Sequence, residues 1–157
     1  MQDISEAYYY SRLQDEEEYK DFVCNRLWRN ESIFVGPYLS RKFQKEHGES
    51  QSGIAIAFDR HMNSTGKIFI ETGRKETRTA KEFEPSGIYA KNSWLYIVGD
   101  YTEAYAFSTR QMIRIVEDAA YRRAKGIEEL VKSIKKGFLY PTSAAIDGYA
   151  IRHFVFS

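Results

Sequence analysis

The sequence predicts a single α/β domain in which helices flank a central mixed sheet. The chain has 157 residues, which is enough for one domain with a proper core. Its composition, 43% hydrophobic and 29% charged, is ordinary for a soluble globular protein. Stretches with helical spacing of apolar residues alternate with short apolar runs typical of strands. No internal repeat, low-complexity segment or linker divides the chain, so residues 1–157 are expected to form one unit.

The N-terminal half predicts two helices and three strands. A helix is expected over residues 11–29, because Tyr19, Val23 and Leu27 recur at helical spacing and acidic residues occupy its early turns. The apolar run 32–38 predicts a strand that ends at Gly36-Pro37, and residues 40–48 predict one or two helical turns. Residues 53–59 and 67–73 predict the two strands of a hairpin joined by a turn over 60–66.

The C-terminal half also predicts strands that alternate with helices. Residues 75–85 predict a loop, and 93–99 and 101–107 predict an antiparallel pair of strands. Ser108 is a candidate N-cap for a helix over 109–123, and 126–136 predicts a further helical stretch. After the apolar run 137–140, Thr142 or Ser143 is expected to begin a last helix through Tyr149, and 151–156 predicts a final strand.

Charge and cysteine content narrow the class of protein. The formal net charge is +1, so no global basic field indicates nucleic acid, although a local basic face remains compatible with it. The single cysteine, Cys24, has no internal disulfide partner and is expected to be a buried small apolar residue. We expect a cytoplasmic location, since no apolar signal segment is present, and no run approaches the ~20 residues of a membrane span.

The predicted hairpin places two carboxylates where a metal ion could join them. If its turn is centred near Thr65, Asp59 lies opposite Glu71, with Cβ atoms about 5 Å apart. A hard cation such as Mg²⁺ or Mn²⁺ removes the repulsion between two such groups and can activate water at a phosphodiester. Lys75, four residues after Glu71, could stabilise the developing charge. The alternative is an ordinary hairpin in which Asp59 caps a turn.

The order acidic residue, hairpin, acidic residue, lysine resembles the PD-(D/E)XK nuclease superfamily. The stretches "QKEHGESQSGIAIAFDRHMNSTGKIFIETGRK", "SGIYAKNSWLYIVGDY" and "KKGFLYPTSAA" are similar to small phage-type proteins of that superfamily. The resemblance covers roughly residues 32–150. It implies a restriction-endonuclease-like domain that hydrolyses phosphodiester bonds in DNA with Mg²⁺ or Mn²⁺, in the cytoplasm of a bacterial or phage-infected cell.

The chain departs from the superfamily at its central motif. Where the similar proteins read Gly-Ile-Glu-Ile-Lys-x-Asp, this chain has alanine at positions 55 and 57. We therefore interpret Ala55 and Ala57 as the positions of a lost catalytic Glu and Lys, and expect an impaired endonuclease. In a rival arrangement Asp59 and Glu71 form the metal pair of an active enzyme. Because Gly73 then occupies the lysine position, Lys75 or Lys91 would have to replace it.

Further candidates surround this motif. Glu49 and Glu18 are additional candidate metal ligands under the resemblance, although an exposed loop position explains Glu49 at least as well and the helix dipole explains Glu18 more simply. Basic and amide residues that could contact DNA phosphates are Arg41, Lys42, Gln44, Arg74, Lys75 and Arg78. Cleavage of both strands would favour a homodimer. The alternative function is a non-catalytic DNA-binding or protein-interaction module on the same fold; a small-molecule-binding domain lacks a glycine-rich phosphate loop.

Overall fold

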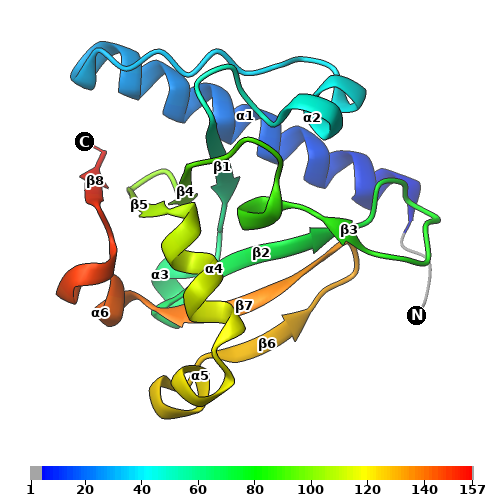
Figure 1. Cartoon of the computed structure of the whole chain (residues 1–157). Helices are drawn as coiled ribbons and strands as arrows, with labels where there is room; N and C mark the ends of the chain where they lie inside the picture. The colour runs from blue at the N-terminus through cyan, green and yellow to red at the C-terminus, as the bar shows by residue number, and fades with distance from the viewer. Residues whose placement is uncertain (1–4, 157) are drawn as a thin grey trace.

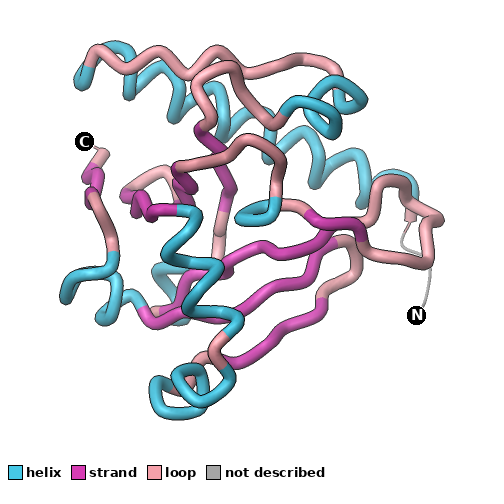
Figure 2. Tube along the Cα trace, in the orientation of Figure 1, coloured by secondary structure: helices cyan, strands magenta, loops and turns pink. Residues whose placement is uncertain are grey.

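The computed structural model describes residues 5–156 and contains two four-stranded sheets (Figures 1 and 2). The first has the order β1-β4-β5-β8, formed by Ile54–Phe58, Leu95–Gly99, Glu103–Ser108 and Arg152–Val155. Strands β1 and β4 are parallel and the other neighbours antiparallel. The second, entirely antiparallel sheet has the order β3-β2-β7-β6, formed by Glu84–Pro85, Lys67–Arg74, Lys135–Pro141 and Glu128–Val131. The α/β class with a mixed sheet is confirmed, but the expected single central sheet is wrong.

The two N-terminal helices lie where the sequence predicts them, whereas the short helical turns over 62–65 and 87–89 are not predicted from it. Helix α1 spans Glu6–Glu31 and forms the long blue helix along the top of Figure 1, with α2 (Arg41–His47) beside it. The shorter helices are α3 (Met62–Thr65), η1 (Gly87–Tyr89), α4 (Thr109–Glu117), α5 (Ala119–Lys125), α6 (Thr142–Ala144) and η2 (Ala145–Tyr149). The Ser108 hydroxyl accepts from the Gln111 amide, which confirms the predicted N-cap. Within residues 5–156, no helix has the length and apolar character needed to cross a bilayer.

Two apolar clusters lie on the two faces of the first sheet. Successive side chains of a strand point to opposite faces. Along β1, Ile54 and Ile56 therefore pack against the buried residues of α1, whereas Ala55 belongs to the cluster shared with β2, β7 and α4. A strand buried on both faces carries apolar residues in succession, as parallel strands commonly do. The parallel pairing of β1 with β4 agrees with this burial.

The predicted hairpin of residues 53–73 does not form. Strand β1 pairs with β4, and β2 pairs with β7, so β1 and β2 belong to different sheets. The connection between them contains the helical turn α3, which ends at Gly66 in the left-handed conformation. A connection with its own helix and capping residue directs β2 away from the sheet of β1. Asp59 and Glu71 are consequently not register partners.

Three other local predictions are also corrected. Residues 32–38 form no strand and make a single bridge, between Pro37 and Ser50. The expected helix over 126–136 is instead β6 and the start of β7, joined by a turn in which the Lys132 amide donates to the Lys135 carbonyl. The expected helix over 109–123 is interrupted at Asp118, whose extended backbone ends α4 while its carboxylate accepts from the Tyr121 amide to begin α5.

Candidate functional site

A cavity of about 390 Å³ lies among α1, α2, β1, β2 and residues 84–91. Its lining combines apolar side chains with six basic and five acidic residues. This volume is within the range of pockets that bind small molecules or single chemical groups of a larger ligand. We take the cavity as the candidate functional site, because the charged residues of distant sequence segments converge there.

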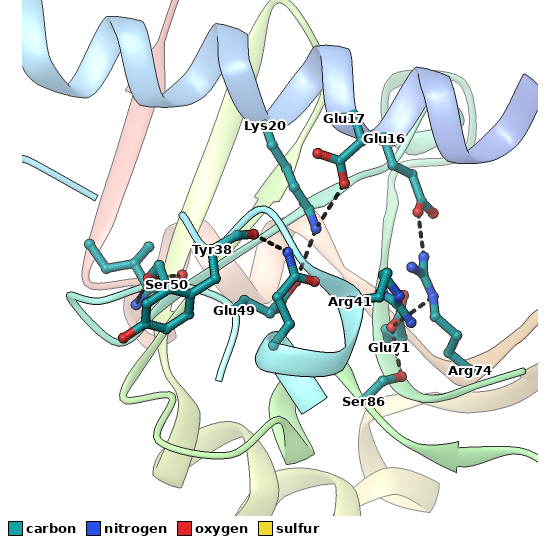
Figure 3. A network of polar contacts seen from close by, with 12 residues as sticks. Glu16, Glu17, Lys20, Tyr38, Arg41, Glu49, Ser50, Glu71, Arg74 and Ser86 are labelled. Carbon is teal, nitrogen blue, oxygen red and sulfur yellow. Dashed lines mark hydrogen bonds and ion pairs between the residues drawn. The ribbon is translucent and has the colours of Figure 1, made fainter. Parts of the chain in front are cut away.

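The inner part of the cavity holds a buried network of charges centred on Glu16 of α1 (Figure 3). One Glu16 carboxylate oxygen lies 2.5 Å from an Arg74 guanidinium nitrogen, and the other contacts the Lys135 ammonium. Each of these side chains is only 10–14% exposed. Buried charges of this kind are tolerated when they are paired and hydrogen-bonded.

Glu71 of β2 completes this network from the opposite side. Its carboxylate accepts a 2.7 Å hydrogen bond from the Ser86 hydroxyl and lies 3.8 Å from Arg74 Nε and 3.7 Å from Lys135 Nζ. The Glu71 amide donates to the hydroxyl of Tyr96 on β4 at 3.2 Å, which ties the two sheets together at the cavity. The carboxylates of Glu16 and Glu71 thus share the same two cations, Arg74 and Lys135.

A second ion pair joins α1 to the segment before β1. Lys20 Nζ lies 3.1 Å from the Glu49 carboxylate and 3.9 Å from that of Glu17 (Figure 3). Next to it, the Gln44 side-chain amide donates to the Tyr38 carbonyl at 2.5 Å. The Gln44 side chain therefore holds the start of α2 in place.

Several groups of the cavity keep a fixed protonation state near neutral pH. Burial raises the pKa of Glu16, but the charges of Arg74 and Lys135 outweigh it and lower the pKa to about 2. Burial lowers the pKa of Lys20, but the Glu49 carboxylate more than offsets this, so the pKa is raised. Burial, and then the charge of Glu71, raises the pKa of Tyr96 well above its usual value. None of these three groups is poised to exchange a proton at neutral pH, as a general acid or base must.

The two alanines of the sequence motif lie on one face of β1, at the edge of this network. Ala57 lines the cavity. Ala55 is fully buried and is the register partner of Tyr96, which also lines the cavity. The structure therefore places Ala57 among the charged residues of the cavity, whereas Ala55 packs in the apolar cluster beside Tyr96.

Asp59 has a structural role in the turn after β1. One carboxylate oxygen accepts from the His61 amide at 3.0 Å, and the other accepts from the Phe69 amide at 2.8 Å. It does not line the cavity. The opposed Asp59–Glu71 pair that suggested a shared cation is therefore wrong, because these bonds hold Asp59 at the connection to β2.

We expect Asp59→Ala to destabilise the fold by about 2 kcal/mol, because the buried Phe69 amide loses its acceptor. Urea unfolding monitored by circular dichroism would measure the change. Asp21→Ala, on the exposed surface of α1, is the matched control and should shift stability by less than about 0.5 kcal/mol. Equal stability of the Asp59→Ala variant and the parent would contradict this role.

Of the other predicted residues, some line the cavity and the rest lie outside its lining. Arg41, Gln44, Glu49 and Arg74 line the cavity, as does Lys91. Lys75 is buried outside the lining, with its ammonium 5.3 Å from the centre of the Phe83 ring, and Arg78 also lies outside it. Glu18 is exposed and accepts from Gln14, and Lys42 of α2 is exposed and outside the cavity lining. The helix-1 carboxylate at the site is therefore Glu16, and of the two lysines proposed to replace the missing one, Lys91 lines the cavity and Lys75 does not.

Sequence reasoning missed Glu16, Lys135, Ser86 and Tyr96 as site residues. Glu16 could have been found, because it precedes Tyr19 and Val23 by three and seven residues and so shares their buried helix face. Lys135 could not, since the pattern of residues 126–136 predicts a helix rather than strands. Ser86 and Tyr96 carry no local signal and reach the site only through the packing of the two sheets.

The residues present do not fit a divalent cation at the predicted pair. Both Asp59 oxygens are hydrogen-bonded to backbone amides, and the Glu71 carboxylate is held by Ser86 and faces two cations. Among residues 5–156, no three His, Cys, Asp or Glu side chains are grouped closely enough to hold a metal ion. In this chain Arg74 and Lys135 neutralise the buried carboxylates.

Comparison with known proteins gives no relative from which a function could be transferred: no family model, curated protein or solved structure matches the chain.

Proposed function

We propose that this chain is a restriction-endonuclease-like domain of the metal-dependent class that acts on DNA, with alanine at two catalytic positions. The observation that carries the proposal is the placement of Ala57. It lines a cavity that also receives carboxylates from three separate elements: Glu16 from α1, Glu49 from the segment before β1, and Glu71 from β2. Converging acids with adjacent cations are the components that phosphodiester hydrolysis requires.

The position of Ala55 supports the same assignment. Register partners lie side by side in a sheet, so Ala55 is next to Tyr96, whose hydroxyl accepts from the Glu71 amide. A glutamate at position 55 would add a carboxylate near Glu71, and a lysine at 57 would extend into the cavity. Only with that added carboxylate would Mg²⁺ or Mn²⁺ have a suitable oxygen set, and the ion would then stabilise charge on the phosphodiester and activate water.

For the chain as it stands, we infer DNA binding without cleavage. At neutral pH Glu16 is ionised and paired, and Tyr96 is protonated, so neither is available as a base. The cationic groups Lys20 and Arg74 remain charged, since the pKa of each is raised. Both are paired with carboxylates, so they hold the site together and do not cleave a phosphodiester, whereas Lys91 of the same cavity is placed to attract a phosphate.

The test is the double substitution Ala55→Glu with Ala57→Lys, assayed for cleavage of single-stranded, duplex and branched DNA. We expect Mg²⁺- or Mn²⁺-dependent cleavage at least about 100-fold above the parent chain, abolished by EDTA. The matched control, Ala55→Gln with Ala57→Met, has similar side-chain sizes without the charges and should remain inactive.

Two outcomes would overturn the proposal. One is a folded double variant, verified by circular dichroism and a cooperative melt, that cleaves none of the three substrates. The other requires no substitution: failure of the parent chain to bind any of the three DNAs at low salt, measured by fluorescence anisotropy. This second measurement decides the matter if the buried glutamate at position 55 prevents folding.

A further inference from the structure

The charged residues deepest in the cavity, which form its charged floor, are largely buried. Glu16, Glu71, Arg74 and Lys135 all line it, yet their side chains are 10–14% exposed. The cavity volume of about 390 Å³ is that of a pocket for a single small ligand. One nucleotide fits this scale, whereas a base-paired duplex is far too wide to reach the floor.

Helix α2 encloses the cavity on one side. Arg41 lies 3.1 Å from Glu76 and Lys45 lies 2.8 Å from Glu84, and all four residues line the cavity. The carbonyl of His47, at the end of α2, accepts from the Asn92 side chain at 2.9 Å. The helix is thus attached at three points to the segment 76–92, so it forms a wall that a duplex would have to displace.

The segment after η1 offers two groups suited to an unpaired strand. Tyr89 lines the cavity and is 36% exposed, so its ring is accessible for stacking with a base. Lys91 also lines the cavity, and within residues 5–156 no carboxylate pairs with it. An aromatic ring beside an unneutralised lysine is the combination that single-stranded nucleic-acid sites use. Duplex readout would instead need an element that enters a groove.

We propose that the cavity takes one unpaired nucleotide, so that the substrate class is single-stranded DNA or the unpaired end of a duplex. This inference rests on the proposed function and specifies its substrate. The strand would enter past Tyr89, with its phosphate held by Lys91 and directed toward Ala57. Base pairing must be absent at this point, because a cavity of about 390 Å³ has the volume for one nucleotide and not for a base pair.

The test compares three labelled DNAs of one sequence by fluorescence anisotropy: a single strand, a blunt duplex, and a duplex with an unpaired overhang. We expect the single strand and the overhang to bind at least about tenfold more tightly than the blunt duplex. Lys91→Ala should weaken binding of the single strand and reduce the slope of log K against log salt by about 1.

Filling the cavity provides a matched pair of variants. Ala57→Phe should reduce single-strand binding at least about tenfold, because the ring occupies the space next to the charged floor. Ala124→Phe, on the exposed surface of α5 outside the cavity lining, should leave it unchanged. Equal binding of all three DNAs, or unaltered binding by a folded Ala57→Phe variant, would overturn the inference.

Failure of this inference is distinguishable from failure of the proposed function. If the Ala55→Glu, Ala57→Lys variant cuts blunt duplex DNA internally while single strands bind no better, the nuclease assignment stands and the single-strand inference falls. If single strands bind selectively through the cavity but the folded double variant never cleaves DNA, the cavity is a single-strand binding site and the nuclease assignment falls. Absence of both binding and cleavage overturns both.

Discussion

Replacing Glu16 with glutamine is expected to destabilise the protein by about 3 kcal/mol, because it removes the closest charged partner of two buried cations. Arg74 and Lys135 are 10% and 14% exposed, and each contacts a different oxygen of the Glu16 carboxylate. Glu71 lies 3.7–3.8 Å from these cations and compensates only in part. Urea unfolding at pH 7, followed by circular dichroism, would measure the loss.

The matched control for this change is Glu17→Gln on the next position of α1. The Glu17 side chain is 61% exposed and lies 3.9 Å from Lys20, so its removal should cost less than about 0.5 kcal/mol. Similar losses for the two variants would show that the buried network does not depend on the Glu16 charge.

The difference in stability between the parent chain and Glu16→Gln is expected to decrease as the pH falls. The Glu16 pKa falls from 4.5 to about 2 on folding, so its stabilisation is complete above pH 4.5 and is lost as the pH falls toward 2. We expect the stability advantage of the parent over Glu16→Gln to shrink across this window by an amount on the order of 3 kcal/mol. A constant difference between pH 5 and pH 2.5 would contradict the lowered pKa.

Substitution of Gly87 by alanine is expected to be the most disruptive backbone change at the site. Gly87 has φ +62°, and a Cβ atom there would lie 2.1 Å from the Glu71 carbonyl oxygen. The segment 86–89 would have to move away from β2, which breaks the hydrogen bond from Ser86 to Glu71. We expect a loss of about 3 kcal/mol or more, measured by urea unfolding, together with weaker DNA binding.

Gly66→Ala separates backbone strain from close contact with β2 as the cause of this loss. Gly66 has φ +68°, nearly the same backbone conformation, but a Cβ atom added there would meet nothing within 4 Å. Its substitution should therefore cost only the strain of the left-handed region, about 1 kcal/mol, and leave DNA binding unaltered. If both variants lose the same stability, the close approach of Gly87 to β2 is not what orders Ser86.

The local elements of this protein are largely predictable, because their signals lie within a few consecutive residues. The long helix, the pair β4 and β5, and the N-cap at Ser108 follow from apolar spacing and capping chemistry. The stretch 126–136 misled the prediction, since its apolar residues are compatible with a helix or with a short strand pair. Only the pairing of β6 with β7 resolves that ambiguity.

The candidate site shows the same division between local and long-range information. The sequence by itself determined that Ala55 and Ala57 share one face of a strand, because side chains alternate along any strand. Which acids that face meets was decided only by the tertiary structure, since the pairing of β1 with β4 and of β2 with β7 carries Glu71 to the cavity and leaves Asp59 in a turn. Strand pairing depends on contacts between distant segments, and those are absent from any short stretch of sequence.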